Sequence, residues 1–385
     1  MLGVVHTIDV GDLPSGLAVT PDGDTVYVAN SLDDTVSVID TDTGTVTKTI
    51  AVGDIPLSVA VSPDGNRAYV NNGEDGTVSV IATATNTVAA TINIADVPNW
   101  VAVSPDNAAI YVTKRNSGTV AVIDTVTHTV TATVSVGGGP AMVAISPDGT
   151  RAYVAKGADS VTDTVSVINT LTNTVIATVD IGNPALAVVV SPDGVRAYVT
   201  KLNDNTLSVI DTATNTVTTT ITVGLAPAMI VFSPDGGTAY VTNAVDGTLS
   251  VIDTATDTVT STVDVGDNPV GLAVGPDGST LYVTNAEDDI VSVISRVFKK
   301  PSIDADLVGK VFGGADVGAG GFIVIGNHFY KIPPHSPLLT NIARAAAPRL
   351  GRAIVNRRLG RELRNMLVWR ADGDVENPRL APSPG

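Results

Sequence analysis

The chain of 385 residues has no cysteine, and only 4% of its residues are aromatic. Without cysteine, disulfide bridges and thiolate chemistry are excluded, and the redox compartment stays open. No run of about 18 apolar residues occurs, so the sequence predicts no transmembrane helix. A basic and apolar leader of the signal-peptide type is not recognisable at the start. The hydrophobic fraction is nevertheless 44%, and Val, Ile and Ala supply most of it, as in closely stacked β-sheets.

Residues suited to catalysis or metal binding are also scarce. The four histidines, at His6, His128, His328 and His335, form no spacing typical of a metal site or a catalytic set. Pairs of acidic residues occur in turns, as at Asp33-Asp34, but they lack the spaced ligands and glycine of a calcium loop. The sequence therefore predicts no enzyme activity, no metal and no cofactor.

What the chain does contain is a repeat. Seven segments end in Pro-Asp-Gly or a close variant, and their aspartates are spaced by 42 residues with a single exception of 45, at Asp22, Asp64, Asp106, Asp148, Asp193, Asp235 and Asp277. Within each period, β-branched residues alternate with small ones in four short runs bounded by Gly, Pro, Asn and Asp. Seven units of four strands predict an all-β, seven-bladed propeller.

The ends of the repeat predict how the ring closes. Residues 4–10 align with residues 46–52, the fourth strand of the first full repeat. The last repeat ends after its third strand, at 290–295, and lacks a fourth. Pairing of the N-terminal strand with the last blade would complete that blade and remove an open sheet edge. We therefore expect a propeller domain over residues 1–295.

Motifs within the repeat resemble a known family. Tyr-Val-Thr-Asn occurs at 240–243 and 282–285, with variants that begin at Tyr27, Tyr69 and Tyr111, and Ser-Pro-Asp-Gly and Val-Ile-Asp-Thr lie at fixed offsets. The chain thereby resembles the YVTN-repeat β-propellers, which include YncE-like bacterial envelope proteins and archaeal surface-layer proteins. The resemblance covers residues 1 to about 295 and implies an extracytoplasmic protein of the periplasm, cell envelope or secreted fraction. The sequence by itself leaves a cytoplasmic location open.

Charge divides the chain into two parts. Residues 1–295 carry a net charge of −24, whereas residues 296–385 carry +7. Such an acidic propeller should repel nucleic acids and anionic membranes, and the basic tail should be attracted to anionic surfaces.

The tail, residues 296–385, is predicted to be a small α+β module. A linker and a glycine-rich stretch precede a β-hairpin over 321–325 and 328–332, and two helices are expected over 336–347 and 348–369. The second helix carries six arginines, at Arg349, Arg352, Arg357, Arg358, Arg361 and Arg364. They could dock on the acidic propeller or another subunit, lie on an anionic membrane surface, or bind nucleic acid or an acidic protein.

One group of residues departs from the repeat in an organised way. The residue predicted to open each innermost strand is small in most blades but is Trp100, Met142 and Met229 in three of them. The loop after the second strand begins with Asn in most blades but with Lys114, Lys156 or Lys201 in blades 3–5, and Arg115 follows the first lysine. Apolar side chains ringed by cations form a plausible binding patch. The alternative is drift of exposed positions, with methionine filling gaps.

These observations favour a non-enzymatic interaction or scaffold protein of the cell envelope or surface, which presents a binding face to a protein, peptide or glycan. The basic tail would dock or anchor it. One alternative is a single-stranded nucleic-acid-binding propeller, which the resemblance to YncE-like proteins suggests and in which Trp100 would stack on bases. The net charge of the propeller disfavours it. Another alternative is a lactonase-like or lyase-like propeller enzyme, for which no acid–base set is recognisable.

Overall fold

The computed structural model describes residues 2–157, 163–296, 321–325 and 328–332. The chain divides into two units, Met1–Phe298 and Lys299–Gly385. In the second unit, β29 (Gly321–Ile325) pairs antiparallel with β30 (His328–Ile332), which confirms the predicted hairpin. The two expected helices and their six arginines lie outside the described residues, as do the linker and the glycine-rich stretch.

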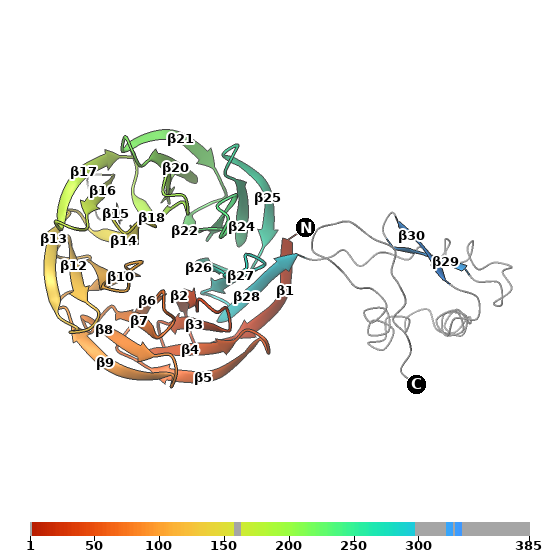
Figure 1. The fold of residues 1–385 in the computed structure, drawn as a ribbon, viewed down its shortest axis with the longest axis horizontal. Helices are drawn as coiled ribbons and strands as arrows, with labels where there is room; N and C mark the ends of the chain where they lie inside the picture. Colours follow the sequence, from red (N-terminus) through yellow and green to blue (C-terminus); the bar gives the residue numbers. More distant parts are fainter. Residues whose placement is uncertain (1, 158–162, 297–320, 326–327, 333–385) are drawn as a thin grey trace. The chain divides into compact units, whose positions relative to one another are not determined.

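The first unit is a seven-bladed propeller, in which seven four-stranded antiparallel sheets surround one axis (Figure 1). The innermost strands are β2 (Pro14–Val19), β6 (Pro56–Val61), β10 (Pro98–Val103), β14 (Pro140–Ile145), β18 (Ala185–Val190), β22 (Pro227–Phe232) and β26 (Pro269–Val274). The second strands are β3 (Thr25–Asn30), β7 (Arg67–Asn72), β11 (Ala109–Lys114), β15 (Arg151–Lys156), β19 (Arg196–Lys201), β23 (Thr238–Asn243) and β27 (Thr280–Asn285).

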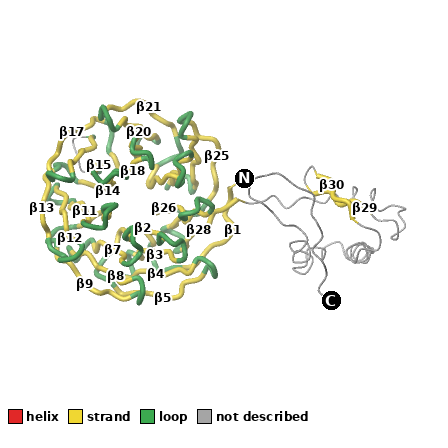
Figure 2. Tube along the Cα trace, viewed as in Figure 1, coloured by secondary structure: helices red, strands yellow, loops and turns green. Residues whose placement is uncertain are grey.

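The outer two strands of each sheet complete blades 1 to 7, numbered in chain order from β2. The third strands are β4 (Thr35–Asp40), β8 (Thr77–Ala82), β12 (Thr119–Asp124), β16 (Thr164–Asn169), β20 (Thr206–Asp211), β24 (Thr248–Asp253) and β28 (Ile290–Arg296). The outermost strands are β5 (Thr45–Ala51), β9 (Thr87–Asn93), β13 (Val130–Ser135), β17 (Thr174–Asp180), β21 (Thr216–Thr222), β25 (Thr258–Asp264) and β1 (Leu2–Asp9). Among the described residues the ordered elements are all strands, joined by short loops (Figure 2).

Ring closure follows the prediction. β1 pairs antiparallel with β28, so that Ile8 lies opposite Val291 and Asp9 opposite Ile290. The sheet order β1-β28-β27-β26 therefore joins the first residues of the chain to the last blade. The N–H of Val10 continues the pairing to the carbonyl oxygen of Asp289 at 3.0 Å.

Each Pro-Asp-Gly segment forms the turn between the first two strands of a blade. In blade 2, the Ser62 hydroxyl donates to Asp64 Oδ1 at 2.6 Å, and the N–H of Asn66 donates to the same oxygen at 3.0 Å. These bonds stabilise the carboxylate and hold the pKa of Asp64 below its usual value. Repetition of this geometry explains why the motif recurs at nearly constant spacing.

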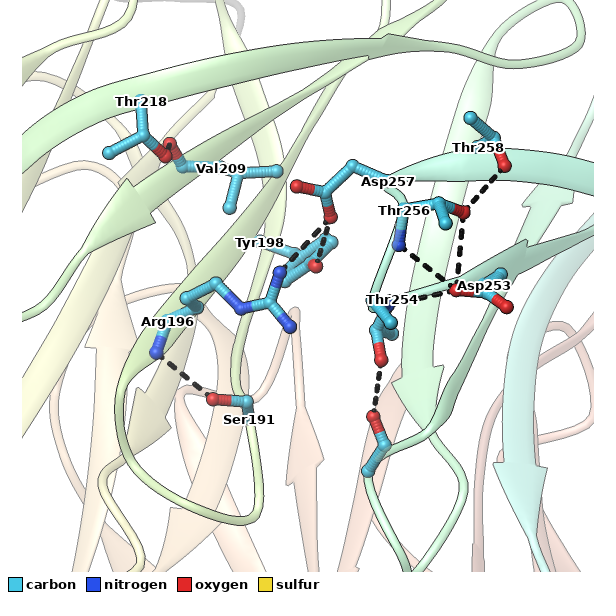
Figure 3. Close-up of polar contacts among 12 residues, drawn as sticks. Ser191, Arg196, Tyr198, Val209, Thr218, Asp253, Thr254, Thr256, Asp257 and Thr258 are labelled. Atoms are coloured by element: carbon cyan, nitrogen blue, oxygen red, sulfur yellow. Dashed lines mark hydrogen bonds and ion pairs between the residues drawn. The ribbon is translucent and has the colours of Figure 1, made fainter.

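Tyrosine side chains of the second strands join neighbouring blades at two places. Tyr27 and Tyr198 are almost completely buried, and their hydroxyls donate to a turn residue of the next blade, Asn86 at 2.5 Å and Asp257 at 2.7 Å. At the joint between blades 5 and 6, Arg196 also contacts Asp257 at 3.2 Å (Figure 3). Burial, followed by the bond to Asp257, raises the pKa of Tyr198 far above its usual value.

We expect this joint to contribute measurably to stability. Asp257→Ala should lower the free energy of unfolding by about 1–2 kcal/mol more than Asn173→Ala does, because charge-assisted bonds to Arg196 and Tyr198 are lost. Asn173 occupies the corresponding turn of blade 4 with the same left-handed backbone, φ 52° against 53° for Asp257. Among the described residues its carboxamide oxygen has no hydrogen-bond partner. Alanine at Asn173 therefore carries the same backbone cost as at Asp257 without the loss of a bond to that oxygen. Urea unfolding of both variants measures the difference, and equal losses would contradict the assignment.

Candidate functional site

A cavity of about 200 Å³ lies on the propeller axis and is lined by residues of all seven innermost strands. Trp100, Met142 and Met229 lie together in its wall, as the sequence predicted for one shared mouth of the central channel. They do not open their strands, however. Each is the third residue, because the strands begin earlier at Pro98, Pro140 and Pro227. Strand assignment from the apolar runs missed these prolines, which suit the first position of a strand.

The wall of the cavity is uneven. Trp100 is partly buried and packs against the clusters that contain Met142 and Val143. The backbone N–H of Trp100 donates to Thr113 Oγ1 at 2.9 Å, and this bond holds the backbone from which the indole projects. The corresponding positions in blades 1 and 7 are Gly16 and Gly271, so bulk is concentrated on one side of the axis. The wall of this small cavity is therefore mostly apolar, with few polar groups.

The lysines do not form the expected exposed ring. Each is the last residue of a second strand, not the first of a loop, and none lines the axial cavity. Lys156 is only 5% exposed and Lys201 only 8%, whereas Lys114 is partly buried and Arg115 is exposed. The sequence prediction was wrong on exposure because this position faces into the blade rather than toward solvent.

The asparagines at the same position in the other blades show what the site normally does. Asn30 Nδ2 donates to Thr35 Oγ1 at 3.0 Å and to Ser37 Oγ at 2.9 Å, and its side chain is fully buried. The equivalent residues Asn72, Asn243 and Asn285 donate to the matching serine at 2.9–3.0 Å. This asparagine clamp therefore holds the second and third strands of blades 1, 2, 6 and 7 together.

The loop before the innermost strand has two conformations, and they follow the same division. In blades 1, 2, 6 and 7 the residue directly before the strand is left-handed, with φ between 52° and 54°, at Leu13, Ile55, Ala226 and Asn268. In blades 3, 4 and 5 left-handed residues come earlier, at Ala95 in blade 3, at Gly137 and Gly138 in blade 4, and at Gly182 in blade 5. Blades 3–5 thus differ from the other blades in backbone as well as in side chains. Random sequence drift at single exposed positions does not explain a coordinated difference of this kind.

Two of the three lysines have acidic neighbours. Lys201 Nζ lies 3.2 Å from Asp204 Oδ2, which also accepts a bond of 2.6 Å from Asn183 Nδ2. In blade 3, burial opposes ionisation of Asp96. Hydrogen bonds from Ser117 and Val97 and the charge of Lys114 outweigh it, so the pKa of Asp96 lies below its usual value. For Lys156 the structure gives no ion pair within the described residues, and burial lowers its pKa.

Comparison with known proteins places the chain in a family. The model of the Choice-of-anchor I domain matches residues 58–261, which is more than half of the chain. The chain belongs to the choice-of-anchor I domain family. A second model, the YNCE-like beta-propeller, matches residues 11–92 and confirms the resemblance to YncE-like propellers. The family description points to a surface-associated propeller.

A solved structure supports the fold of this choice-of-anchor I propeller. A chain of Kuenenia stuttgartiensis Hydrazine Synthase matches with a TM-score of 0.68 and 23% identity, over 74% of this chain and 96% of that one. At this identity the likeness concerns the fold alone. No curated protein sequence matches the chain.

Other features bear on the chemistry of the described part. Within it, no three His, Cys, Asp or Glu side chains lie close enough together to hold a metal ion. No helix formed by these residues is long and apolar enough to cross a membrane.

The asparagine clamp was missed by sequence reasoning, although the recurrence of Asn in four repeats of one chain was a signal that could have revealed it.

Proposed function

We propose that this protein is a non-enzymatic, surface-associated propeller that binds an apolar or amphipathic group of a protein, peptide or glycan partner in its axial cavity. The observation that carries the proposal is the convergence of Trp100, Met142 and Met229 on one cavity whose remaining wall is mostly aliphatic or small. A rigid indole beside adaptable thioethers in a concave site is typical of a binding anchor.

The composition of the wall also supports a binding function rather than an enzymatic one. The lining residues are Trp, Met, Leu, Val, Ala, Gly, Ser and Asn, and none of these side chains titrates near neutral pH. General acid–base chemistry would need such a group within hydrogen-bond reach of a substrate. A role in binding single-stranded nucleic acid is likewise less well supported, because Lys156 and Lys201 are buried and the propeller carries a charge of −24.

The basic tail completes the proposal. Its charge of +7 is opposite to that of the propeller, so the tail would dock on an acidic surface or anchor the protein at an anionic one. Surface association agrees with the family description.

Trp100 provides both the test and its readout. In a Trp369→Phe background it is the sole tryptophan, so partners from a peptide and glycan array can be titrated by its fluorescence. We expect saturable binding without turnover. Trp100→Ala removes the fluorophore, so its affinity is compared with wild type by isothermal titration, and binding should weaken by about 2 kcal/mol, or roughly 30-fold. Because Trp100 is partly buried, Trp100→Phe serves as a control that retains apolar bulk. A partner bound equally well by wild type and Trp100→Ala would rule out the cavity.

A further inference from the structure

The joint at which the ring closes differs from the other joints between blades. The hairpin turn after the third strand of one blade faces the tyrosine of the preceding blade, and one residue of this turn is left-handed. In blades 2 to 6 that residue carries a side chain, with φ between 52° and 57°, at Asn86, His128, Asn173, Asn215 and Asp257. In blade 1, which faces blade 7, the same position is Gly44, with φ 63°.

A cavity lies where the turn of blade 1 lacks this side chain. It has a volume of about 270 Å³ and is lined by residues of β1, β27, β28 and the turn 41–44. A Cβ on Gly44 would lie 3.1 Å from His6 Cδ2, so the imidazole of β1 borders the position that a turn side chain takes elsewhere. His6 Nε2 donates to the carbonyl oxygen of Gly44 at 3.2 Å, which holds this side of the cavity.

The Tyr282 hydroxyl is a hydrogen-bond donor that this cavity leaves without an acceptor. Tyr282 lines the cavity and is 6% exposed, whereas Tyr27, whose hydroxyl donates to Asn86, is 1% exposed. In the part of the chain that the structure describes, the Tyr282 hydroxyl makes no hydrogen bond. Burial, and then the charge of Asp277, raise the pKa of Tyr282, so the hydroxyl stays protonated. A buried donor of this kind is costly unless a ligand accepts from it.

The surroundings of Tyr282 favour a neutral amide over a carboxylate. Where the turn residue is a carboxylate, at Asp257, the guanidinium of Arg196 lies 3.2 Å from it (Figure 3). Arg196 is the first residue of its second strand, and the first residue of β27 is Thr280, which is uncharged. The wall contains Asp42 instead, which repels anions and can accept from an N–H group. A donor and an acceptor in one wall match the C=O and N–H of an amide.

We propose that the cavity at the ring closure binds a primary carboxamide, either of a free small molecule or of an Asn or Gln side chain in a partner. The amide oxygen accepts from the Tyr282 hydroxyl, as the oxygen of Asn86 does from Tyr27, and the amide N–H donates to Asp42. This site goes beyond the function proposed above, because it shares no lining residue with the axial cavity.

The test uses the full chain and ligand-observed NMR titrations with acetamide, acetate and the peptides Gly-Asn-Gly and Gly-Ala-Gly. Acetamide should bind at least tenfold more tightly than acetate. Tyr282→Phe, which keeps the ring, should weaken acetamide binding at least fivefold, and Trp100→Ala should leave it unchanged. Tighter binding of Gly-Asn-Gly than of acetamide and Gly-Ala-Gly would support a partner's side chain as the ligand, and binding of acetamide alone would support a free small molecule.

Two exchanges at the turn position provide matched variants. Gly44→Asn supplies the side chain that blade 2 has at Asn86, and its left-handed backbone suits asparagine; it should abolish acetamide binding. Asn86→Gly should open a second cavity beside Tyr27 and add a second acetamide site. Thermal melts confirm folding, and Gly44→Asn combined with His6→Ala answers the same question if the single variant does not fold. No acetamide binding by wild type, or equal affinity of wild type and Gly44→Asn, would overturn the proposal.

Discussion

Deletion of residues 2–9 should remove the cooperative unfolding transition that the intact chain shows at its melting temperature. The shortened chain should aggregate. These residues form β1, which pairs with the outer edge of β28 over seven residue positions from Leu2 to Asp9. Ile8 is buried in one cluster with Tyr282 and Val291, so the deletion also uncovers the core at the ring joint. An exposed, apolar strand edge is a template for pairing with other chains.

Light scattering during a thermal melt measures this effect. Addition of a synthetic peptide of residues 1–11 should partly restore the transition, because it offers β28 the same partner strand in trans. An unchanged melting temperature in the deletion variant would show that β1 is dispensable for closure.

Gly271→Ala should be the most damaging single substitution at the axial cavity, costing about 3 kcal/mol of the free energy of unfolding. A Cβ at this position would lie 2.2 Å from the carbonyl oxygen of Ser15 and 2.5 Å from Thr284 Oγ1. Thr284 Oγ1 donates to that carbonyl at 2.6 Å and accepts from the N–H of Gly271 at 2.8 Å. Even a methyl group must therefore displace the contact between blades 7 and 1.

Gly237→Ala provides the control for this prediction. Its Cβ would meet only Asp235, at 3.6 Å and beyond, and its backbone is not left-handed. We expect Gly237→Ala to change stability by less than about 0.5 kcal/mol. Denaturant unfolding compares the two variants, and similar small losses at both positions would mean that the backbone near Ser15 relaxes easily.

The sequence by itself determined the architecture. Seven copies of the Pro-Asp-Gly turn at nearly constant spacing specify seven similar sheets, because each turn is built from local hydrogen bonds such as those of Ser62 and Asn66 to Asp64. The offset between the first strand and the repeat specified that β1 closes the ring, and the structure confirms this. The repeat also predicted that Trp100, Met142 and Met229 lie close together, because equivalent positions of a closed ring face the same axis. The three residues line one cavity.

Only the tertiary structure decided what the lysines of blades 3–5 do. Exposure depends on loop conformation and on neighbouring blades, and neither can be read from a strand pattern. The left-handed residue moves from Leu13 in blade 1 to Gly137 in blade 4, and this movement accompanies the exchange of a clamp asparagine for Lys156. A residue that the sequence placed on the surface is therefore buried, and only 5% of Lys156 is exposed.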